Sequence, residues 1–372
     1  MRIGVPKETV DGERRVALVP DVVKSLKKNE HVDVLVESGA GDAAGHPDSQ
    51  YTDAGAEIAA PDAIWGADVV LRVAVPTAEE IGKLKSGQVF IGHLNPWVSA
   101  ETNKALAAVG VTSFAMEAIP RTTRAQAMDA LSSQAAAAGY AAMLIAARES
   151  GRFFGMMTTA AGTVPPAKVL VLGAGVAGLQ AVATAKRLGA IVTGFDIRRA
   201  AWEQIASLGG RPLELDFIPD AEGEGGYARP LTDEENAQVR DALTDNAAKQ
   251  DIIVTTAAIP GRPAPLLITA DAVRGMSPGS VIVDLAAETG GNCELTEPGQ
   301  TVVVNGVKVI GPRNLASEMP APASQLYAKN LENLLGLMVT EEGALNVDFE
   351  DDIIAAACIT QGGEIKNERA AK

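Results

Sequence analysis

The chain has 372 residues, enough for two domains, and its 47% hydrophobic and 21% charged residues are typical of a soluble globular protein. The net charge of −15 argues against nucleic acid or anionic lipid as a direct partner, since a negative surface is repelled by both. No stretch approaches eighteen uninterrupted apolar residues, and the N-terminus has no signal-peptide pattern. We therefore expect a cytoplasmic protein with no segment inserted in a membrane.

Short apolar runs alternate with amphipathic segments in the first third of the chain. We predict strands in five runs, at residues 1–6, 33–38, 68–76, 88–94 and 111–119. Residues 21–30 and 100–110 carry apolar residues at a spacing of three to four, which predicts helices. This alternation is typical of βαβ units and predicts a mostly parallel sheet.

The rest of the chain predicts two long helices around a second α/β unit. The Ala-rich stretch from Ala125 to about Glu149 predicts one continuous helix, and residues 325–339 predict another that returns the chain to the first domain. Between them we expect strands near residues 168–172, 190–196, 250–259, 279–286, 301–306 and 307–311. The predicted fold is α/β, with two Rossmann-like, doubly wound parallel-sheet domains joined by long helices. Residues 1–130 and 320–372 would form the first domain, and residues 131–319 the second.

The second unit opens on a glycine loop with a G-x-G-x-x-G pattern, formed by Gly173, Gly175 and Gly178. An apolar strand precedes it and a helix follows, which is the context of a dinucleotide-binding loop. Gly173 would permit the tight turn, Gly175 the approach of a pyrophosphate, and Gly178 the close packing of helix on strand. The backbone N–H groups of Val176 and Ala177 would face the phosphates. The alternative is a Gly-rich turn that binds nothing.

An acidic residue, Asp196, ends the next predicted strand about twenty residues beyond the loop. Its carboxylate would accept hydrogen bonds from the adenosine ribose and repel a 2′-phosphate, so NAD(H) is favoured over NADP(H). Ile197 and Arg198 follow directly, and Arg198 could instead accommodate a 2′-phosphate. We therefore predict that residues 131–319 are a Rossmann NAD(H)-binding domain.

Metal sites are not expected. Cys293 and Cys358 do not form a Cys-x-x-Cys pair, and the chain has three histidines. A structural zinc site needs about four such ligands at close spacing. We interpret both cysteines as reduced and structural.

Many hydrogen-bonding side chains gather in "RTTRAQAMDALSSQ", between Arg121 and Gln134, although the neighbouring sequence is mostly small and apolar. Gln126 and Asp129 are three residues apart and would share a helix face if the helix began at Ala125. The alternative is a polar helix start without a ligand, for which Thr122 or Thr123 would be a good N-cap.

The chain resembles the NAD(H)-binding component of proton-translocating nicotinamide nucleotide transhydrogenase over nearly its whole length. Long blocks carry the resemblance, among them "PKETVDGERRVALVP", "PRTTRAQAMDALSSQAAAAGYAAML", "TTAAIPGRPAPLLIT" and "MSPGSVIVDLAAETGGNCELTEPG". It implies direct hydride transfer between NADH and NADP⁺, with NADP(H) bound on a partner subunit. It further implies membrane-spanning subunits that couple transfer to proton translocation, a peripheral location on the cytoplasmic face, and a homodimer.

The resemblance also assigns residues. Arg121, Gln126 and Asp129 match the family's loop at the nicotinamide end of NAD(H), and Gly226 and Tyr227 match a mobile loop that folds over the cofactor. The remaining cofactor contacts would come from Thr122, Thr123, Arg124, Ser132 and Ala258. Arg313 and Glu318 stand where the family more often has Thr and Arg, so contacts from that segment are not carried over.

The main alternative is alanine dehydrogenase, to which the chain is more distantly similar. Arg15 matches its carboxylate-binding Arg and His93 its catalytic His, but its Lys falls on Ala74 and its Asp becomes Glu288. Without the Lys a proton-handling group is missing, so we do not expect amino-acid oxidation. We interpret His93 as a buried, hydrogen-bonded side chain. We interpret Arg15 as a structural side chain that stabilises its domain. A third reading is an NAD-responsive binding module that transfers no hydride.

Overall fold

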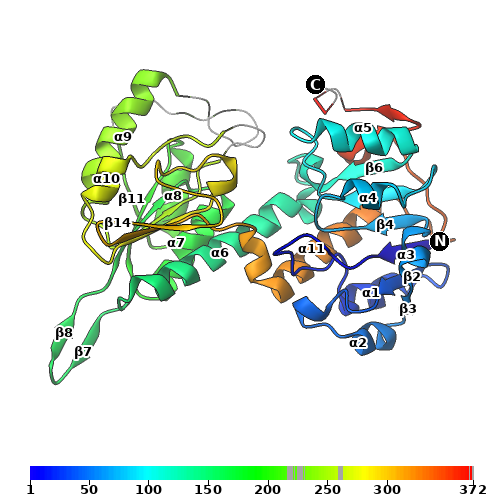
Figure 1. Cartoon of the computed structure of the whole chain (residues 1–372), viewed down its shortest axis with the longest axis horizontal. Helices are drawn as coiled ribbons and strands as arrows, with labels where there is room; N and C mark the ends of the chain where they lie inside the picture. Colours follow the sequence, from blue (N-terminus) through cyan, green and yellow to red (C-terminus); the bar gives the residue numbers. More distant parts are fainter. Residues whose placement is uncertain are drawn as a thin grey trace. The chain divides into compact units, whose positions relative to one another are not determined.

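The computed structural model describes residues 1–215, 221, 223, 229, 231–258, 263–367 and 369–370. The chain divides into two compact units, each with its own sheet (Figure 1). Unit 1 comprises Met1–Gln134 and Ala316–Lys372, and unit 2 comprises Ala135–Leu315. Unit 1 therefore holds both termini. Both sheets are dominated by parallel pairs, which confirms the predicted fold class.

The sheet of unit 1 has the strand order β17-β16-β6-β5-β4-β1-β2-β3. The strands are β1 (Arg2–Val5), β2 (Asp33–Glu37), β3 (Glu57–Ala59), β4 (Val69–Leu71), β5 (Val89–Gly92), β6 (Thr112–Ala115), β16 (Cys358–Gln361) and β17 (Glu364–Ile365). β1 to β6 pair in parallel, and β16 adds an antiparallel strand beside β6. Val69 and Leu71 enter one buried cluster while Val70 enters another, so both faces of the sheet are covered. Burial on both faces explains why the strands read as continuous apolar runs.

Helices cover the faces of this sheet. They are α1 (Pro20–Leu26), α2 (Asp48–Asp53), α3 (Pro61–Trp65), α4 (Ala78–Ile81), α5 (Ala100–Val109), α11 (Pro320–Leu335) and α12 (Asp352–Ala357). α11 begins earlier than predicted because Pro320 and Pro322 fit the first turn of a helix, where their missing N–H groups cost nothing. The chain enters unit 1 at the short 3-10 helix η6 (Leu315–Glu318), so this turn makes the return that we had assigned to the long helix.

The sheet of unit 2 has the order β11-β10-β9-β12-β13-β15-β14. The strands are β9 (Lys168–Leu172), β10 (Ile191–Phe195), β11 (Arg211–Pro212), β12 (Ile252–Thr255), β13 (Val281–Asp284), β14 (Thr301–Val304) and β15 (Val307–Ile310). The helices of this unit are α7 (Val176–Arg187), α8 (Ala200–Ser207), α9 (Asp233–Ala247) and α10 (Ala270–Arg274). From β9 the sheet extends through β10 and β11 in one direction. From β12, the other neighbour of β9, it extends through β13, β15 and β14 in the opposite direction. In such sheets ligands bind at the carboxyl ends of the two strands where the order reverses, here β9 and β12.

A long Ala-rich helix, α6 (Ala130–Ser150), spans the division between the units, and a separate hairpin of β7 (Met157–Thr159) and β8 (Gly162–Val164) follows it. Within the described residues α6 alone is long and apolar enough to cross a membrane by length and composition, with 44% of its apolar window buried. The core helix of a soluble protein meets the same criterion, so this is weak evidence for a membrane span.

Both cysteines are free and buried, and burial raises the pKa of each thiol to about 11. Because the thiolate is the reactive form, the native protein should react with a thiol reagent at pH 8 at least about a hundredfold more slowly than a free cysteine. Urea should release two reactive thiols. Rapid labelling of the folded chain would contradict this expectation, and Cys293→Ala and Cys358→Ala variants would assign the signal to one position.

Candidate functional site

The glycine loop joins β9 to α7, and two of its glycines are required by the protein itself. Gly173 has φ +95°, and a Cβ there would stand 2.8 Å from Thr256 Oγ1. A Cβ on Gly178 would stand 1.8 Å from the carbonyl oxygen of Gly173, a distance that forces the backbone to move. These two positions therefore demand glycine whether or not a ligand binds.

Gly175 is different. Its φ is −74°, which any residue adopts, and among the described residues no atom lies within 4 Å of a Cβ built there. Gly175 and Val176 are exposed at the N-terminus of α7, where backbone N–H groups have no partner within the helix. Glycine at this position thus leaves open a space that the protein does not fill.

The start of α7 packs closely on α6. A Cβ on Gly139, in the part of α6 that belongs to unit 2, would stand 2.1 Å from the carbonyl oxygen of Ala177. Sequence reasoning missed this contact, although a lone glycine inside an Ala-rich helix is a signal of close approach. The contact fixes the first turn of α7 and with it the N–H groups next to Gly175.

The loop after β12 lies beside the glycine loop at the carboxyl edge of the sheet. Thr256 Oγ1 donates a hydrogen bond to the carbonyl oxygen of Gly173 at 3.0 Å. Ala257 exchanges hydrogen bonds with the side chain of Asn292, and Ala258 is exposed. The structure therefore brings the predicted contact Ala258 to the same edge as the glycine loop.

A buried carboxylate that we did not predict holds these loops. Asp284, at the end of β13, accepts hydrogen bonds from Thr255 Oγ1 at 2.8 Å, Thr296 Oγ1 at 2.7 Å and the Asn292 N–H at 2.8 Å. Its side chain is fully satisfied by the protein, so its role is to shape the loops rather than to meet a ligand. An acidic residue at the end of a buried apolar strand was the available signal.

Asp196 lies at the end of β10 and is only 7% exposed. Its carboxylate accepts the Ala174 N–H at 2.8 Å and the backbone N–H of Arg198 at 2.9 Å. The Arg198 guanidinium adds two charge-assisted bonds, from Nε at 2.9 Å and from Nη2 at 2.8 Å. Asp196 is thus tied to the glycine loop, and Arg198 is paired with it. The half-buried Ile197 packs against the core of the unit.

The stretch after β6 departs from the predicted helix. Gln126 lies in a 3-10 turn, η3 (Gln126–Met128), and α6 begins only at Ala130. Asp129 has ψ 87° and accepts the Ser132 N–H at 2.9 Å and Ser132 Oγ at 2.6 Å, so it caps α6. Two expectations are corrected: the helix does not begin at Ala125, so Gln126 and Asp129 do not lie in one α-helix, and neither Thr122 nor Thr123 is the cap of α6. The short polar side chain of Asp129 competes with the helix and breaks it.

The exposed polar side chains of this stretch are those of Arg121, Thr122, Thr123, Arg124 and Gln126. Arg124 forms a bidentate pair with Asp351, at 2.7 and 2.8 Å, and also bonds Asp352. Asp351 is the N-cap of α12, and hydrogen bonding to Arg124 lowers the pKa of its carboxyl to about 2. Arg124 therefore links this stretch to α12 through ion pairs. Its expected contact with the cofactor stays a prediction.

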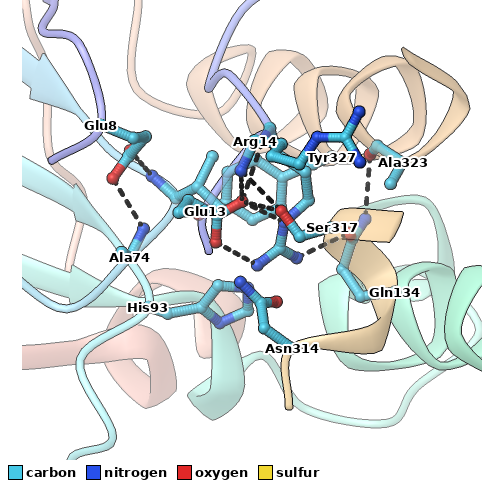
Figure 2. Close-up of polar contacts among 12 residues, drawn as sticks. Glu8, Glu13, Arg14, Ala74, His93, Gln134, Asn314, Ser317, Ala323 and Tyr327 are labelled. Atoms are coloured by element: carbon cyan, nitrogen blue, oxygen red, sulfur yellow. Dashed lines mark hydrogen bonds and ion pairs between the residues drawn. The ribbon is translucent and has the colours of Figure 1, made fainter. Parts of the chain in front are cut away.

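Unit 1 contains a buried polar network around Arg15. Figure 2 labels its members Glu13, Gln134, Ser317 and Ala323. The Arg15 guanidinium bonds both carboxylate oxygens of Glu13, at 2.8 and 2.6 Å, and donates to Gln134 Oε1 at 2.9 Å. Gln134 in turn donates to the carbonyl oxygen of Ala323 in α11, and Ser317 Oγ donates to Glu13. Arg15 thus braces unit 1, as interpreted from the sequence.

Two other positions that match functional residues of alanine dehydrogenase, Ala74 and His93, also make contacts within unit 1. Ala74, in place of the Lys, donates its N–H to Glu8 at 3.4 Å, and Glu8 pairs with the fully buried Arg72. β4 ends at Leu71, earlier than predicted, and the N–H groups of Val73 and Ala74 donate to the Glu8 carboxylate instead of to a neighbouring strand. His93 is half-buried, with its ring stacked on Tyr327 at 5.2 Å and Nδ1 3.5 Å from Glu117.

Three positions that the sequence analysis named, two predicted contacts and one departure from the family pattern, add nothing to this geometry. Gly226 and Tyr227 lie outside the described residues. Glu318 forms an exposed ion pair with Arg14 at 3.9 Å.

Family models match almost the whole chain. The model described as alanine dehydrogenase/PNT, N-terminal domain, matches residues 4–138, and the corresponding C-terminal domain model matches residues 142–368. The chain belongs to the alanine dehydrogenase/PNT family. This finding confirms the resemblance stated from the sequence.

Within the family, the chain is 48% identical to an NAD(P) transhydrogenase subunit alpha protein of Rhodospirillum rubrum, over 98% of this chain and 97% of the relative. It is 30% identical to alanine dehydrogenase of Bacillus subtilis, over 100% of this chain and 94% of the relative. The solved structure of a transhydrogenase from Sinorhizobium meliloti superposes with a TM-score of 0.90 at 46% identity, covering 98% of this chain and 100% of the other. The greater similarity is thus to transhydrogenases.

Proposed function

We propose that the chain is the NAD(H)-binding subunit of a proton-translocating NAD(P)⁺ transhydrogenase. Hydride passes directly between NADH on this chain and NADP⁺ on a partner subunit, and membrane-spanning subunits couple the transfer to proton translocation. The chain acts as a homodimer and is peripheral on the cytoplasmic face of the membrane through its partners. Similarity to transhydrogenase subunits over nearly the whole chain supports this assignment.

Gly175 is the structural observation that supports cofactor binding best. Its backbone conformation suits any residue and a Cβ would meet open space, so the protein alone does not explain glycine. A pyrophosphate that approaches the N–H groups of Val176 and Ala177, at the start of α7, does explain it. The position at the carboxyl ends of β9 and β12 agrees with this reading, because ligands of such sheets bind where the strand order reverses.

The bound nicotinamide supplies the hydride chemistry, so the task of the residues of this chain is to bind the cofactor and orient its nicotinamide ring. The start of α7 would hold the pyrophosphate, and Asp196 with Arg198 would meet the adenosine ribose. Arg121, Gln126 and Asp129 would set the angle of the nicotinamide ring, since direct transfer requires the two reacting carbons to lie about 3–3.5 Å apart. No general acid or base on this chain is needed for that step.

Amino-acid oxidation is disfavoured by the Arg15 network. Glu13 already occupies the guanidinium with a bidentate pair, and the Arg15 and Glu13 side chains are 8% and 2% exposed. A substrate carboxylate would have to displace this internal carboxylate and leave its charge buried, which is costly. Ala74 supplies no proton-handling group in place of Lys.

The proposal is tested with the purified chain and three assays. NADH binding is followed by nicotinamide fluorescence, hydride transfer by NADH-dependent reduction of NADP⁺ after addition of the NADP(H)-binding subunit, and dehydrogenase activity with L-alanine and NAD⁺. We expect binding in the first, turnover in the second and none in the third. Binding without transfer would leave an NAD-responsive module, and NADH formation from alanine would favour the dehydrogenase.

Cofactor choice gives a further prediction. NADH should bind at least about tenfold more tightly than NADPH, because a 2′-phosphate beside Asp196 would meet a carboxylate, a mismatch typically worth about 1–3 kcal/mol. Competition of both nucleotides in the fluorescence assay measures the ratio. The substitution Asp196→Asn should reduce this preference for NADH over NADPH. Equal binding by the wild-type chain would contradict the role of Asp196, and loss of NADPH binding in Arg198→Gln would then identify Arg198 as the 2′-phosphate receiver.

A further inference from the structure

Asn330, in α11, is a buried polar side chain to which the proposed mechanism gives no task. It is only 6% exposed. The next residue, Leu331, and Met128 of η3 belong to the same buried apolar cluster. An amide in such surroundings is costly unless its donor and its acceptor both have hydrogen-bond partners. The partners of Asn330 therefore show which part of the chain it organises.

These partners lie on opposite sides of Asp129. Asn330 Nδ2 donates to the carbonyl oxygen of Ala127 at 2.9 Å, and Asn330 Oδ1 accepts from Ser133 Oγ at 2.7 Å. Ala127 belongs to η3 and Ser133 to the first turn of α6. A carbonyl oxygen can only accept, so the amide nitrogen must be the atom that faces Ala127. One side chain of α11 thus spans the break between η3 and α6.

Local bonds alone hold the bend at Asp129 weakly. Asp129 has ψ 87°, and its carboxylate bonds forward to the first turn of α6. The backbone bond across the turn, from the Asp129 N–H to the Gln126 carbonyl oxygen, is long at 3.3 Å. Asn333 also donates to the Ala127 carbonyl oxygen, at 3.3 Å. Of these two ties from α11 to η3, the 2.9 Å bond from Asn330 is the shorter.

We propose that Asn330 is a positioning residue for hydride transfer, which sets the bend at Asp129 and so aims Gln126 and Asp129 at the nicotinamide ring. The inference rests on the proposed function and names a residue that acts through these two side chains. Groups that orient a reacting ring must be held to within about 0.5 Å, which requires hydrogen bonds from a supporting layer of side chains. Asn330 provides two such bonds from within unit 1.

The test compares Asn330→Ala with a matched control, Asn103→Ala. Asn103, in α5 of the same unit, is fully buried and donates to the carbonyl oxygens of Pro96 and Ala370 at 2.9 and 3.1 Å. Both substitutions therefore remove a buried amide that bonds the backbone, and both should lower the melting temperature. Only Asn330→Ala removes the link across the bend.

Amide hydrogen exchange of the chain without NADH measures the bend directly. In Asn330→Ala, exchange across residues 126–133 should be about tenfold faster than in the wild type, because the loss of a buried hydrogen bond promotes local opening. Asn103→Ala should leave the exchange of these residues unchanged. Unchanged exchange across this stretch in Asn330→Ala overturns the proposal.

Stopped-flow transfer to the NADP(H)-binding subunit measures the consequence. Asn330→Ala should slow hydride transfer about tenfold or more, since a small misplacement of the ring is costly in rate. NADH affinity should change less than about threefold, because the glycine loop belongs to unit 2. The double variant Asn330→Ala with Asp129→Asn should be about as slow as Asp129→Asn alone, since both changes act on one group.

Normal transfer in Asn330→Ala, equal slowing in Asn103→Ala, or a double variant that loses the product of the two single losses overturns the proposal. Ser133→Ala removes one of the two bonds and repeats the test, with a smaller effect, if Asn330→Ala does not fold. If Asp129→Asn transfers slowly and Asn330→Ala transfers normally, only the role of Asn330 fails. If Asp129→Asn also transfers normally, the proposed nicotinamide contact itself fails.

Discussion

Replacing Asp129 with Asn should slow hydride transfer about a hundredfold while leaving most NADH binding intact. Asp129 belongs to unit 1, whereas the glycine loop that would hold the pyrophosphate belongs to unit 2. Removing the carboxylate charge should misplace the nicotinamide ring, and an error of about 1 Å can cost roughly a hundredfold in rate. Stopped-flow transfer to the NADP(H)-binding partner measures the rate, and fluorescence titration measures NADH binding.

The structure makes this substitution informative because Asp129 also caps α6. Asn is as good an N-cap as Asp, so the melting temperature should barely change, whereas Asp129→Ala would also cost about 1 kcal/mol of folding stability. Asp48 is a matched control, since its carboxylate likewise accepts one backbone N–H, from Gly39 at 2.8 Å, and one hydroxyl, from Ser38 at 2.7 Å. Asp48→Asn should transfer hydride normally. If Asp129→Asn also transfers normally, Asp129 is only a helix cap.

Gly175→Ala should abolish most NADH binding without harming the fold. The backbone at Gly175 has φ −74° and a Cβ meets open space, so alanine is accommodated and can even stabilise the chain slightly by reducing the freedom of the unfolded state. A pyrophosphate at the start of α7 would be pushed away from the N–H groups by the added methyl group. We expect NADH to bind at least about thirtyfold more weakly, equivalent to about 2 kcal/mol.

Substitutions of two further glycines serve as comparisons for Gly175→Ala. Gly275→Ala is the matched control, since φ is −79° and the nearest atoms to a Cβ lie at 3.5 Å, an ordinary contact within the same unit. It should bind NADH normally. Gly178→Ala, with its 1.8 Å clash, should lower both the melting temperature and NADH binding. Unchanged NADH binding in Gly175→Ala would mean that no phosphate approaches the loop there, and would remove the structural support for the proposed cofactor site.

The sequence by itself determined the features that depend on local pattern. The apolar runs gave the positions of the strands, because burial on both faces of a parallel sheet requires continuous apolar residues. The G-x-G-x-x-G loop and Asp196 were recognisable because Gly173 and Gly178 meet requirements set by the turn and the helix, and Asp196 stands at the expected spacing at the end of the next strand. Family membership followed from long blocks of sequence and is confirmed by models covering both halves of the chain.

Only the structure decided where the first long helix begins and where side chains meet partners far away in sequence. The break at Asp129 was missed because its carboxylate satisfies the first turn of α6, an interaction that competes with helical propensity and leaves no periodic signal. The pairing of Arg15 with Gln134 joins residues 119 positions apart, and that of Arg124 with Asp351 joins residues 227 apart. Spacing in the sequence carries no information on such contacts, since they form only when the sheet has brought its helices and loops together.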